Sequence, residues 1–172
     1  MPLTLIKETG AGLADANAYA SVADGDAYHA GHLYASAWTA ASADNKVVAL
    51  VMASRLLDAE YQFGGVRTVM TQALQWPRVD CPDPDTGDMV AETMVPKAVV
   101  EAACELAREL LISDRTAAPA GEGLKYYNNA GVQTGYDKAD TRPIIPAIVQ
   151  ALLAKYGALI KSKSGSVKLV RV

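Results

Sequence analysis

The chain has 172 residues, enough for one domain with its own core, and its composition, 51% hydrophobic but only 6% aromatic, favours helices over an aromatic-rich β-sandwich. No apolar run approaches the roughly 20 residues that span a bilayer and the N-terminus has no signal-peptide pattern, so we expect a soluble, non-secreted protein without a membrane partner. The net charge of −3 is unevenly distributed, because residues 1–140 carry ten Lys and Arg against nineteen Asp and Glu, whereas residues 141–172 carry six Lys and Arg and no acid.

A capping box at residues 21–24 predicts a first helix that runs to about Ser36. Its packing face would be small and would consist of Ala23, Ala27, Ala30 and Tyr34. The two histidines of the chain, His29 and His32, share one side of this helix. Because no Cys or His nearby completes a metal shell, we expect solvated surface histidines rather than metal ligands.

A second helix is predicted to begin at Ser42 and to end at Gly64-Gly65. Two adjacent apolar stripes cover more than half of its circumference: Val47, Leu50, Val51, Leu57 and Tyr61 form one, and Val48, Met52, Leu56 and Phe63 form the other. A helix this apolar is either central to the fold or buried by another subunit.

Residues 66–95 contain several prolines and aspartates, which predicts an irregular segment with room for one short hairpin. Within it, Trp76-Pro77-Arg78 is either a contact knob for a partner or the anchor of an irregular segment to the core, and the sequence leaves both open. The aspartates of residues 80–88 faintly resemble a calcium loop. Met94 stands where such a loop needs its bidentate Glu, so we interpret them as turn residues.

Val95-Pro96 predicts the beginning of a third helix, whose apolar face is formed by Val99, Val100, Ala103, Leu106, Ala107, Leu110 and Leu111. Charged residues are predicted to lie toward its other side, namely Lys97, Glu101, Glu105 and Arg108. The cysteines, Cys81 and Cys104, make neither a disulfide framework nor a zinc site, so we expect a reducing compartment.

From residue 115 to residue 143 the chain is rich in Gly, Asn, Ala and Pro with interspersed tyrosines, which predicts a long loop or arm. A final helix is predicted from Pro146 to about Ile160, with an apolar face formed by Ile148, Val149, Leu152, Leu153, Tyr156, Leu159 and Ile160. Residues 166–172 alternate polar and apolar side chains, like a strand that adds to the edge of another sheet.

These elements predict a mainly α fold: a small bundle of about four helices with short β segments, a long loop or arm and an extended C-terminal tail. The single domain would comprise an N-terminal strand and helical core (1–114), the arm (115–143) and a C-terminal helix with a basic tail (144–172). The sequence shows no phosphate-binding loop, nucleophile elbow or placed nucleophile–base pair, so we expect neither enzyme activity nor a cofactor. The basic tail would contact an acidic partner protein, contact nucleic acid or simply be solvated.

Several segments follow one protein family in order and spacing: residues 5–12, 16–24, 26–28, 53–58, 64–68, 72–78, 95–107 and 146–153, with Val170-Arg171 at the end. The most specific of them is Gln72-Ala73-Leu74-Gln75-Trp76-Pro77-Arg78. Together they resemble a phage family labelled DnaT-like single-stranded DNA-binding proteins. The chain departs from the family at residues 115–140.

The resemblance implies a structural head–tail connector, or adaptor, of a tailed bacteriophage. Such subunits form a ring, usually dodecameric, beneath the portal, join the capsid to the tail and let DNA pass. The expected partners are the portal protein, copies of the chain itself, a stopper or tail-completion protein below, and the genomic DNA in the lumen. The expected location is the neck of the virion, after assembly in the host cytoplasm.

Under this hypothesis a subunit interface would be formed by Leu50, Val51, Trp76 and Arg78. The basic tail would bind the portal through Lys161, Lys163, Lys168, Leu169, Val170 and Arg171. The alternative interpretation is a single-stranded DNA-binding accessory protein of replication, in which the same tail follows the phosphates and binding depends steeply on salt.

Overall fold

The computed structural model describes residues 3–117, 126–129, 132–135 and 142–160. They form five α-helices and three two-stranded antiparallel sheets, which confirms a mainly α fold with short β segments. The helices are α1 (Val22–Ala30), α2 (Ser36–Thr39), α3 (Ala43–Glu60), α4 (Lys97–Ile112) and α5 (Ala147–Leu153). The sheets pair β1 (Tyr61–Phe63) with β6 (Gly157–Leu159), β2 (Val66–Arg67) with β3 (Arg78–Val79), and β4 (Tyr126–Asn129) with β5 (Val132–Gly135). No helix in the described ranges is long and apolar enough to cross a membrane.

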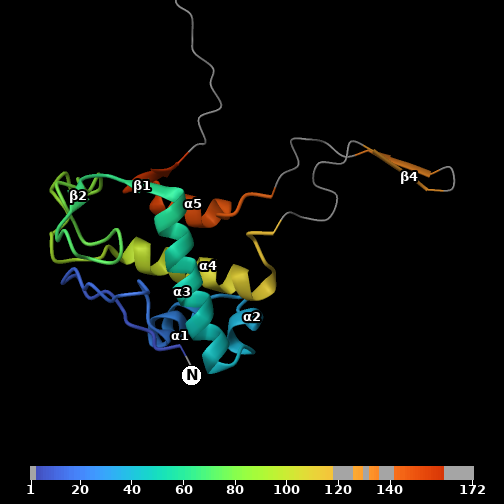
Figure 1. Ribbon diagram of the computed structural model, residues 1–172, viewed down its shortest axis with the longest axis horizontal. Helices are drawn as coiled ribbons and strands as arrows, with labels where there is room; N and C mark the ends of the chain where they lie inside the picture. The colour runs from blue at the N-terminus through green and yellow to red at the C-terminus, as the bar shows by residue number, and fades with distance from the viewer. Residues whose placement is uncertain (1–2, 118–125, 130–131, 136–141, 161–172) are drawn as a thin grey trace, which may run out of the picture.

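Helix α4 lies at the centre of the helical body and contacts each of the other four helices. Helix α3 crosses α4, in front of it in Figure 1, and α5 packs against α4 as well. The core between these helices contains fully buried aliphatic side chains, among them Leu50, Leu57, Leu106, Val149 and Leu153. The inner face of α3 therefore lies in the centre of the fold, which is one of the two roles that the sequence left open for the second predicted helix.

The helix starts follow the predicted capping residues. The Ser21 hydroxyl accepts a hydrogen bond from the Asp24 N–H (3.2 Å), and the Asp24 carboxylate accepts one from the Ser21 N–H (2.7 Å), so the capping box of α1 is present. The Ser42 hydroxyl caps α3 by accepting from the Asn45 N–H (3.2 Å). In α4, Pro96 is the N-cap residue itself and not the first helical residue as expected.

The face that α1 buries differs from the predicted one. The helix ends at Ala30, and its buried residues are Gly25 and His29. A Cβ on Gly25 would lie 2.4 Å from Cζ2 of Trp38 in α2, so the missing side chain is what lets the indole pack against this side of α1. The residues predicted for the packing face are exposed or outside the helix, namely Ala23, Ala27, Ala30 and Tyr34.

The last predicted helix is much shorter in the structure. Helix α5 ends at Leu153, and residues 157–159 form β6, which pairs with β1. Gly157 permits this pairing, because a Cβ there would come within 2.6 Å of the Gln62 carbonyl oxygen. The same pairing ends α3 at Glu60, earlier than predicted. The helical spacing of the apolar residues in this region therefore predicted the wrong element.

The short hairpin expected within residues 66–95 is present as the β2–β3 pair. The expected arm contains the β4–β5 hairpin, in which Tyr126 lies opposite Gly135. The strand predicted at 166–172 lies outside the described residues.

Candidate functional site

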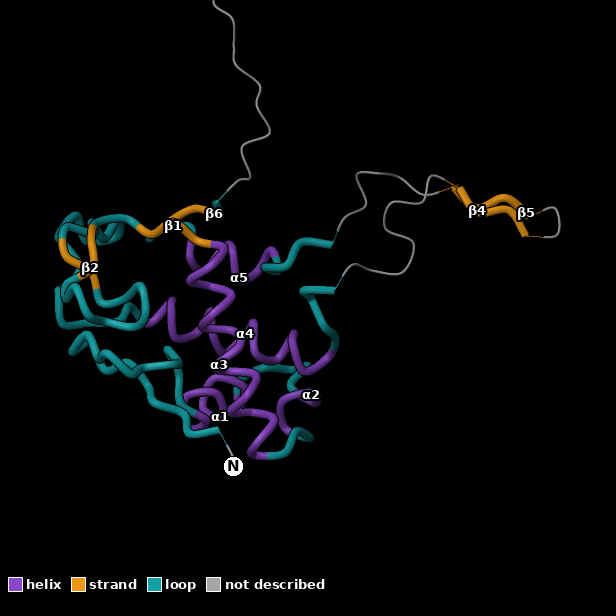
Figure 2. Tube along the Cα trace, viewed as in Figure 1, coloured by secondary structure: helices purple, strands orange, loops and turns teal. Residues whose placement is uncertain are grey.

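The C-terminal basic segment begins where β6 ends. The Ile160 N–H donates to the Glu60 carbonyl oxygen (2.8 Å), which places Ile160 beside the beginning of β1 (Figure 2). The residues predicted to bind a portal come after Ile160 and lie outside the described residues. They are Lys161, Lys163, Lys168, Leu169, Val170 and Arg171.

The other two cations of residues 141–172 are engaged by the body of the protein. Lys155 forms an ion pair with Asp85. Arg142 donates to the Asp114 carbonyl oxygen (2.6 Å) and to the Ser113 hydroxyl (3.1 Å). The other four of the six cations in residues 141–172 therefore follow Ile160. In contrast, the first 140 residues carry a net charge of −9.

Two of the residues predicted for a subunit interface lie inside the chain. Leu50 is completely buried and Val51 is 6% exposed. Leu50 belongs to the hydrophobic core that α3 shares with α4. These side chains are covered almost completely by their own chain, so the free surface that their predicted interface role requires is not found at Leu50 and is only 6% of Val51.

Trp76 is a core anchor and not a contact knob. Its side chain has no exposed surface, and its ring packs edge-to-face against Phe63 (centroids 5.8 Å apart) and Tyr156 (5.9 Å). It thereby fixes the irregular segment before β3 to the β1–β6 sheet. Of the two interpretations that the sequence left open for Trp76, the structure supports the core anchor, and the predicted interface role is wrong.

Arg78 is also buried, with 4% of its surface exposed. Its guanidinium donates to the carbonyl oxygens of Gly64 (2.6 Å), Gly65 (2.7 Å) and Gln75 (3.0 Å), and further to the Gln75 side chain (3.1 Å). Desolvation lowers the pKa of Arg78 from its usual value. The N–H donors of the guanidinium thus link the Gly64-Gly65 turn to the loop at Gln75 inside the chain. The predicted surface role of Arg78 is therefore wrong.

A buried carboxylate near the N-terminus was not expected from the sequence. Glu8 is 1% exposed, and one of its oxygens accepts from the N–H groups of Gly10 (2.9 Å) and Gly12 (3.0 Å). Its other oxygen accepts from the Leu13 N–H (2.8 Å). Glu8 therefore holds the following loop in shape through three backbone donors.

A second unexpected network is centred on Asp58 of α3. Its carboxylate accepts hydrogen bonds from the Tyr19 hydroxyl and from the Gln75 N–H (3.0 Å). The Tyr19 hydroxyl in turn accepts from the N–H groups of Gln75 (3.0 Å) and Trp76 (3.3 Å). Desolvation raises the pKa of Asp58 to about 6 although the Tyr19 bond opposes this. These bonds join the N-terminal segment, α3 and the loop before β3.

The Asp58 network should make stability depend on pH. The native state binds the proton of Asp58 more tightly than the unfolded chain does, because the unfolded carboxyl has its usual pKa of 3.8 and the folded one a pKa of about 6. The Asp58 contribution to the free energy of unfolding should therefore be greatest below pH 3.8, fall by about 3 kcal/mol as the pH rises through the folded pKa of about 6, and then level off. Urea denaturation of the wild type and of Asp58→Asn over this interval measures it.

The variant Asp58→Asn should remove this decline, because the amide does not titrate. The matched control is Asp88→Asn, since Asp88 is exposed, and this variant should keep the wild-type curve. If the wild type and Asp58→Asn show the same dependence of unfolding free energy on pH, Asp58 does not titrate in this interval.

The two histidines were expected at the surface, but His29 is 2% exposed. Its Nε2 atom lies 3.1 Å from the Cys104 carbonyl oxygen, and desolvation lowers its pKa. His32 is half-buried, with Nε2 3.7 Å from a carboxylate oxygen of Glu105. Glu105 was expected on the outer side of α4 but is 2% exposed and pairs with Arg108 (2.6 Å). This cluster links α1 and the loop after it to α4.

The described part of the chain contains no group of three or more His, Cys, Asp and Glu residues arranged to hold a metal ion. Both cysteines are buried and unpaired. Burial raises the pKa of Cys104 to about 12 and raises that of Cys81 as well. Neither thiol is therefore prone to react at neutral pH.

A model of the family described as "Putative DnaT-like ssDNA binding protein" matches residues 3–172. Because the match spans nearly the whole sequence, the chain belongs to this family. No curated protein and no solved structure matches the chain.

The main interpretation of the sequence, a virion head–tail connector that forms a ring beneath the portal, is wrong. The family that matches is described by single-stranded DNA binding, which was the alternative interpretation, and the comparisons show no connector family. The partners and the location in the virion neck that were expected with the connector are tested by none of these findings. The expected lack of enzyme activity likewise stays a prediction.

Proposed function

We propose that this protein binds single-stranded DNA through its basic C-terminal segment, residues 161–172. The charge distribution carries the proposal: the segment contains Lys161, Lys163, Lys168 and Arg171 and no acid, whereas residues 1–140 have a net charge of −9. The family match supports it, because it extends over this segment.

Phosphate contacts would supply the affinity. Each Lys or Arg that neutralises a phosphate releases condensed counterions, and such contacts carry no sequence information. Residues 161–172 contain no aromatic side chain on which bases stack, so binding should depend on charge and hardly on base identity. The acidic remainder of the chain repels the strand and confines it to the C-terminal segment.

The test is fluorescence anisotropy of labelled oligonucleotides at a series of salt concentrations. With four phosphates neutralised, the logarithm of the binding constant should fall with the logarithm of salt concentration with a slope of about −3. Between roughly 50 and 200 mM salt this slope weakens binding about 50-fold. Replacing Lys161, Lys163, Lys168 and Arg171 by Gln should remove both the slope and most of the affinity.

The matched control removes the same number of positive charges, but from residues outside the C-terminal segment. Arg67, Lys97, Arg142 and Lys155 are exposed in the structure, and replacing these four by Gln should leave binding close to wild type. Wild-type protein that fails to bind at low salt would overturn the proposal. Equal losses in the two quadruple variants would show that net charge, and not the C-terminal segment, governs binding.

A further inference from the structure

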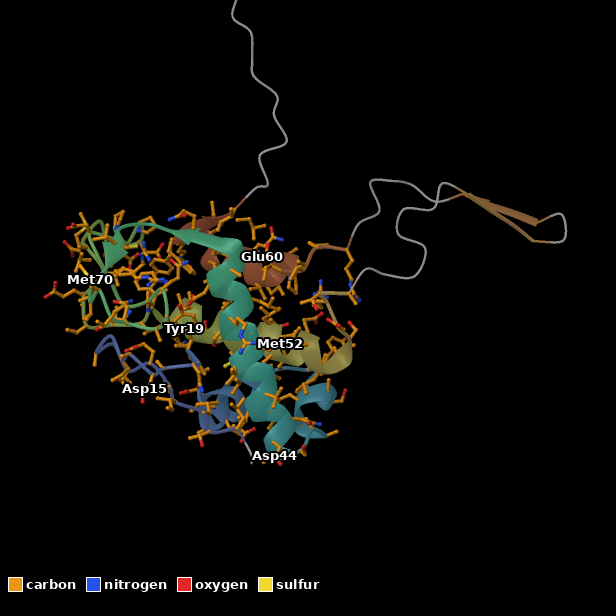
Figure 3. All side chains as sticks on the ribbon, viewed as in Figure 1. Asp15, Tyr19, Asp44, Met52, Glu60 and Met70 are labelled. Carbon is orange, nitrogen blue, oxygen red and sulfur yellow. The ribbon has the colours of Figure 1, made fainter. Side chains whose placement is uncertain are left out.

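The outer face of α3 carries apolar side chains that no described residue covers completely. Val48 is 50% exposed and Met52 is half-buried. They line a groove of about 360 Å³ together with Leu3, which is 47% exposed. Figure 3 shows α3 crossing the front of the body, with Met52 midway between Asp44 and Glu60.

The outward residues of α3 have the spacing of a helix-packing seam. Asn45, Val48, Met52, Arg55 and Ala59 follow one another at intervals of three, four, three and four residues. This is the heptad spacing by which one helix packs along another. Apart from the half-buried Met52 at the centre, all of them are exposed.

Two charges on this face have no ion-pair partner in the part of the chain that the structure describes. Arg55 lines the groove, and Asp44 lies in the first turn of α3. Eleven residues separate them along the helix, a distance of about 16 Å. They are therefore too far apart to pair within one helix, but they are placed to pair between two helices that run in opposite directions.

We propose that a second copy of the chain covers this face, with the two α3 helices packed antiparallel about a two-fold axis. In this register Val48 lies opposite the partner's Met52, and Arg55 lies opposite the partner's Asn45 and beside the partner's Asp44. Two-fold symmetry repeats each contact, so one arrangement covers the apolar centre and pairs the charges at both ends. A parallel arrangement would instead place Arg55 against the partner's Arg55.

The association should be weak. Helix α3 has 18 residues and a length of about 27 Å, so the seam buries an area at the low end of specific interfaces. The dimer should therefore form at high protein concentration and dissociate on dilution. The seam does not include residues 161–172, so this inference does not depend on the proposed DNA binding.

Sedimentation velocity over a range of concentrations, without nucleic acid, tests the association. The wild-type mass should rise from 18.1 kDa toward twice that value. Met52→Glu should stay monomeric, because it buries two charges at the centre of the seam. The control Met70→Glu should behave like the wild type, since Met70 is 96% exposed and lies in the β2–β3 loop, outside α3. A wild type that stays monomeric at every concentration would overturn the proposal.

A charge exchange tests the pairing without touching the apolar centre. Arg55→Glu should weaken the dimer, because Glu then lies beside the partner's Asp44. The double variant Asp44→Arg with Arg55→Glu should restore it, because both pairs form again with reversed signs. A double variant as weak as Arg55→Glu alone would contradict the register.

Disulfide trapping tests the antiparallel direction. A mixture of Val48→Cys chains with Met52→Cys chains should give a crosslinked heterodimer under mild oxidation, whereas neither variant alone should crosslink. The native cysteines give little background because Cys81 and Cys104 are buried. Crosslinking of each variant with itself would show a parallel pair and overturn the proposal.

Discussion

Replacing Arg78 by Met should lower the free energy of unfolding by about 4 kcal/mol. Met fills much of the volume but donates no hydrogen bond, so the partly buried carbonyl oxygens of Gly64, Gly65 and Gln75 lose a charged donor. Chemical denaturation monitored by tryptophan fluorescence measures the loss, because Trp76 lies two residues away.

Arg67→Met is the matched control. Arg67 lies directly opposite Arg78 in the β2–β3 pair, and it is exposed. The same substitution there removes an arginine from the same sheet without leaving buried acceptors unpaired, so it should change the free energy of unfolding by less than about 0.5 kcal/mol. Equal losses at the two positions would mean that the buried hydrogen bonds of Arg78 contribute little.

Replacing Glu8 by Gln should lower the free energy of unfolding by about 3 kcal/mol. The Gln amide keeps one acceptor oxygen but turns an N–H₂ group toward a backbone N–H that now has no acceptor, at Gly10, Gly12 or Leu13. Chemical denaturation gives the overall loss. Hydrogen exchange should locate it, because the amides of residues 10–13 should lose protection before those of α4.

The control for Glu8 is Glu92→Gln. Glu92 is exposed, so the same change of charge there should leave both stability and exchange close to wild type. If Glu8→Gln retains wild-type protection at residues 10–13, water or another group accepts from these amides, and the carboxylate does not hold the loop.

The sequence predicts the beginnings of the helices well, because capping is short-range chemistry. Ser21 and Ser42 each accept from an N–H three residues ahead, so a window of four residues contains the whole signal. Pro96 marks the beginning of α4 within one residue for the same reason.

The face of α1 and the C-terminal strand are not predictable in this way, since both depend on residues distant in the sequence. Trp38 selects the buried side of α1 through its contact at Gly25. Strand β6 exists because β1, almost a hundred residues earlier, offers it a partner, with Leu159 opposite Tyr61. Apolar spacing alone identifies which residues are buried in such places but not the element that buries them.

The buried polar residues were missed for a related reason. A charged side chain is usually exposed, so nothing in the spacing around Asp58 or Glu105 indicates that it is covered. Glu8 offered a signal, because glycines at positions 10 and 12 allow the backbone to turn its N–H groups toward one acceptor. For Arg78 the sequence indicated an important residue, and only the folded loops show that its donors point inward.

The hydrogen bond between Ile160 and Glu60 fixes the point from which the proposed DNA-binding segment starts. Arg171 lies eleven residues after Ile160, and a chain of that length extends at most about 40 Å, so the backbone of Arg171 lies within that radius of the C-terminal end of α3. In the proposed antiparallel pair of α3 helices, the two C-terminal segments (residues 161–172) would start from opposite ends of the seam. One strand of DNA would then be held at two separated places. Binding by one C-terminal segment would raise the local concentration of DNA at the other.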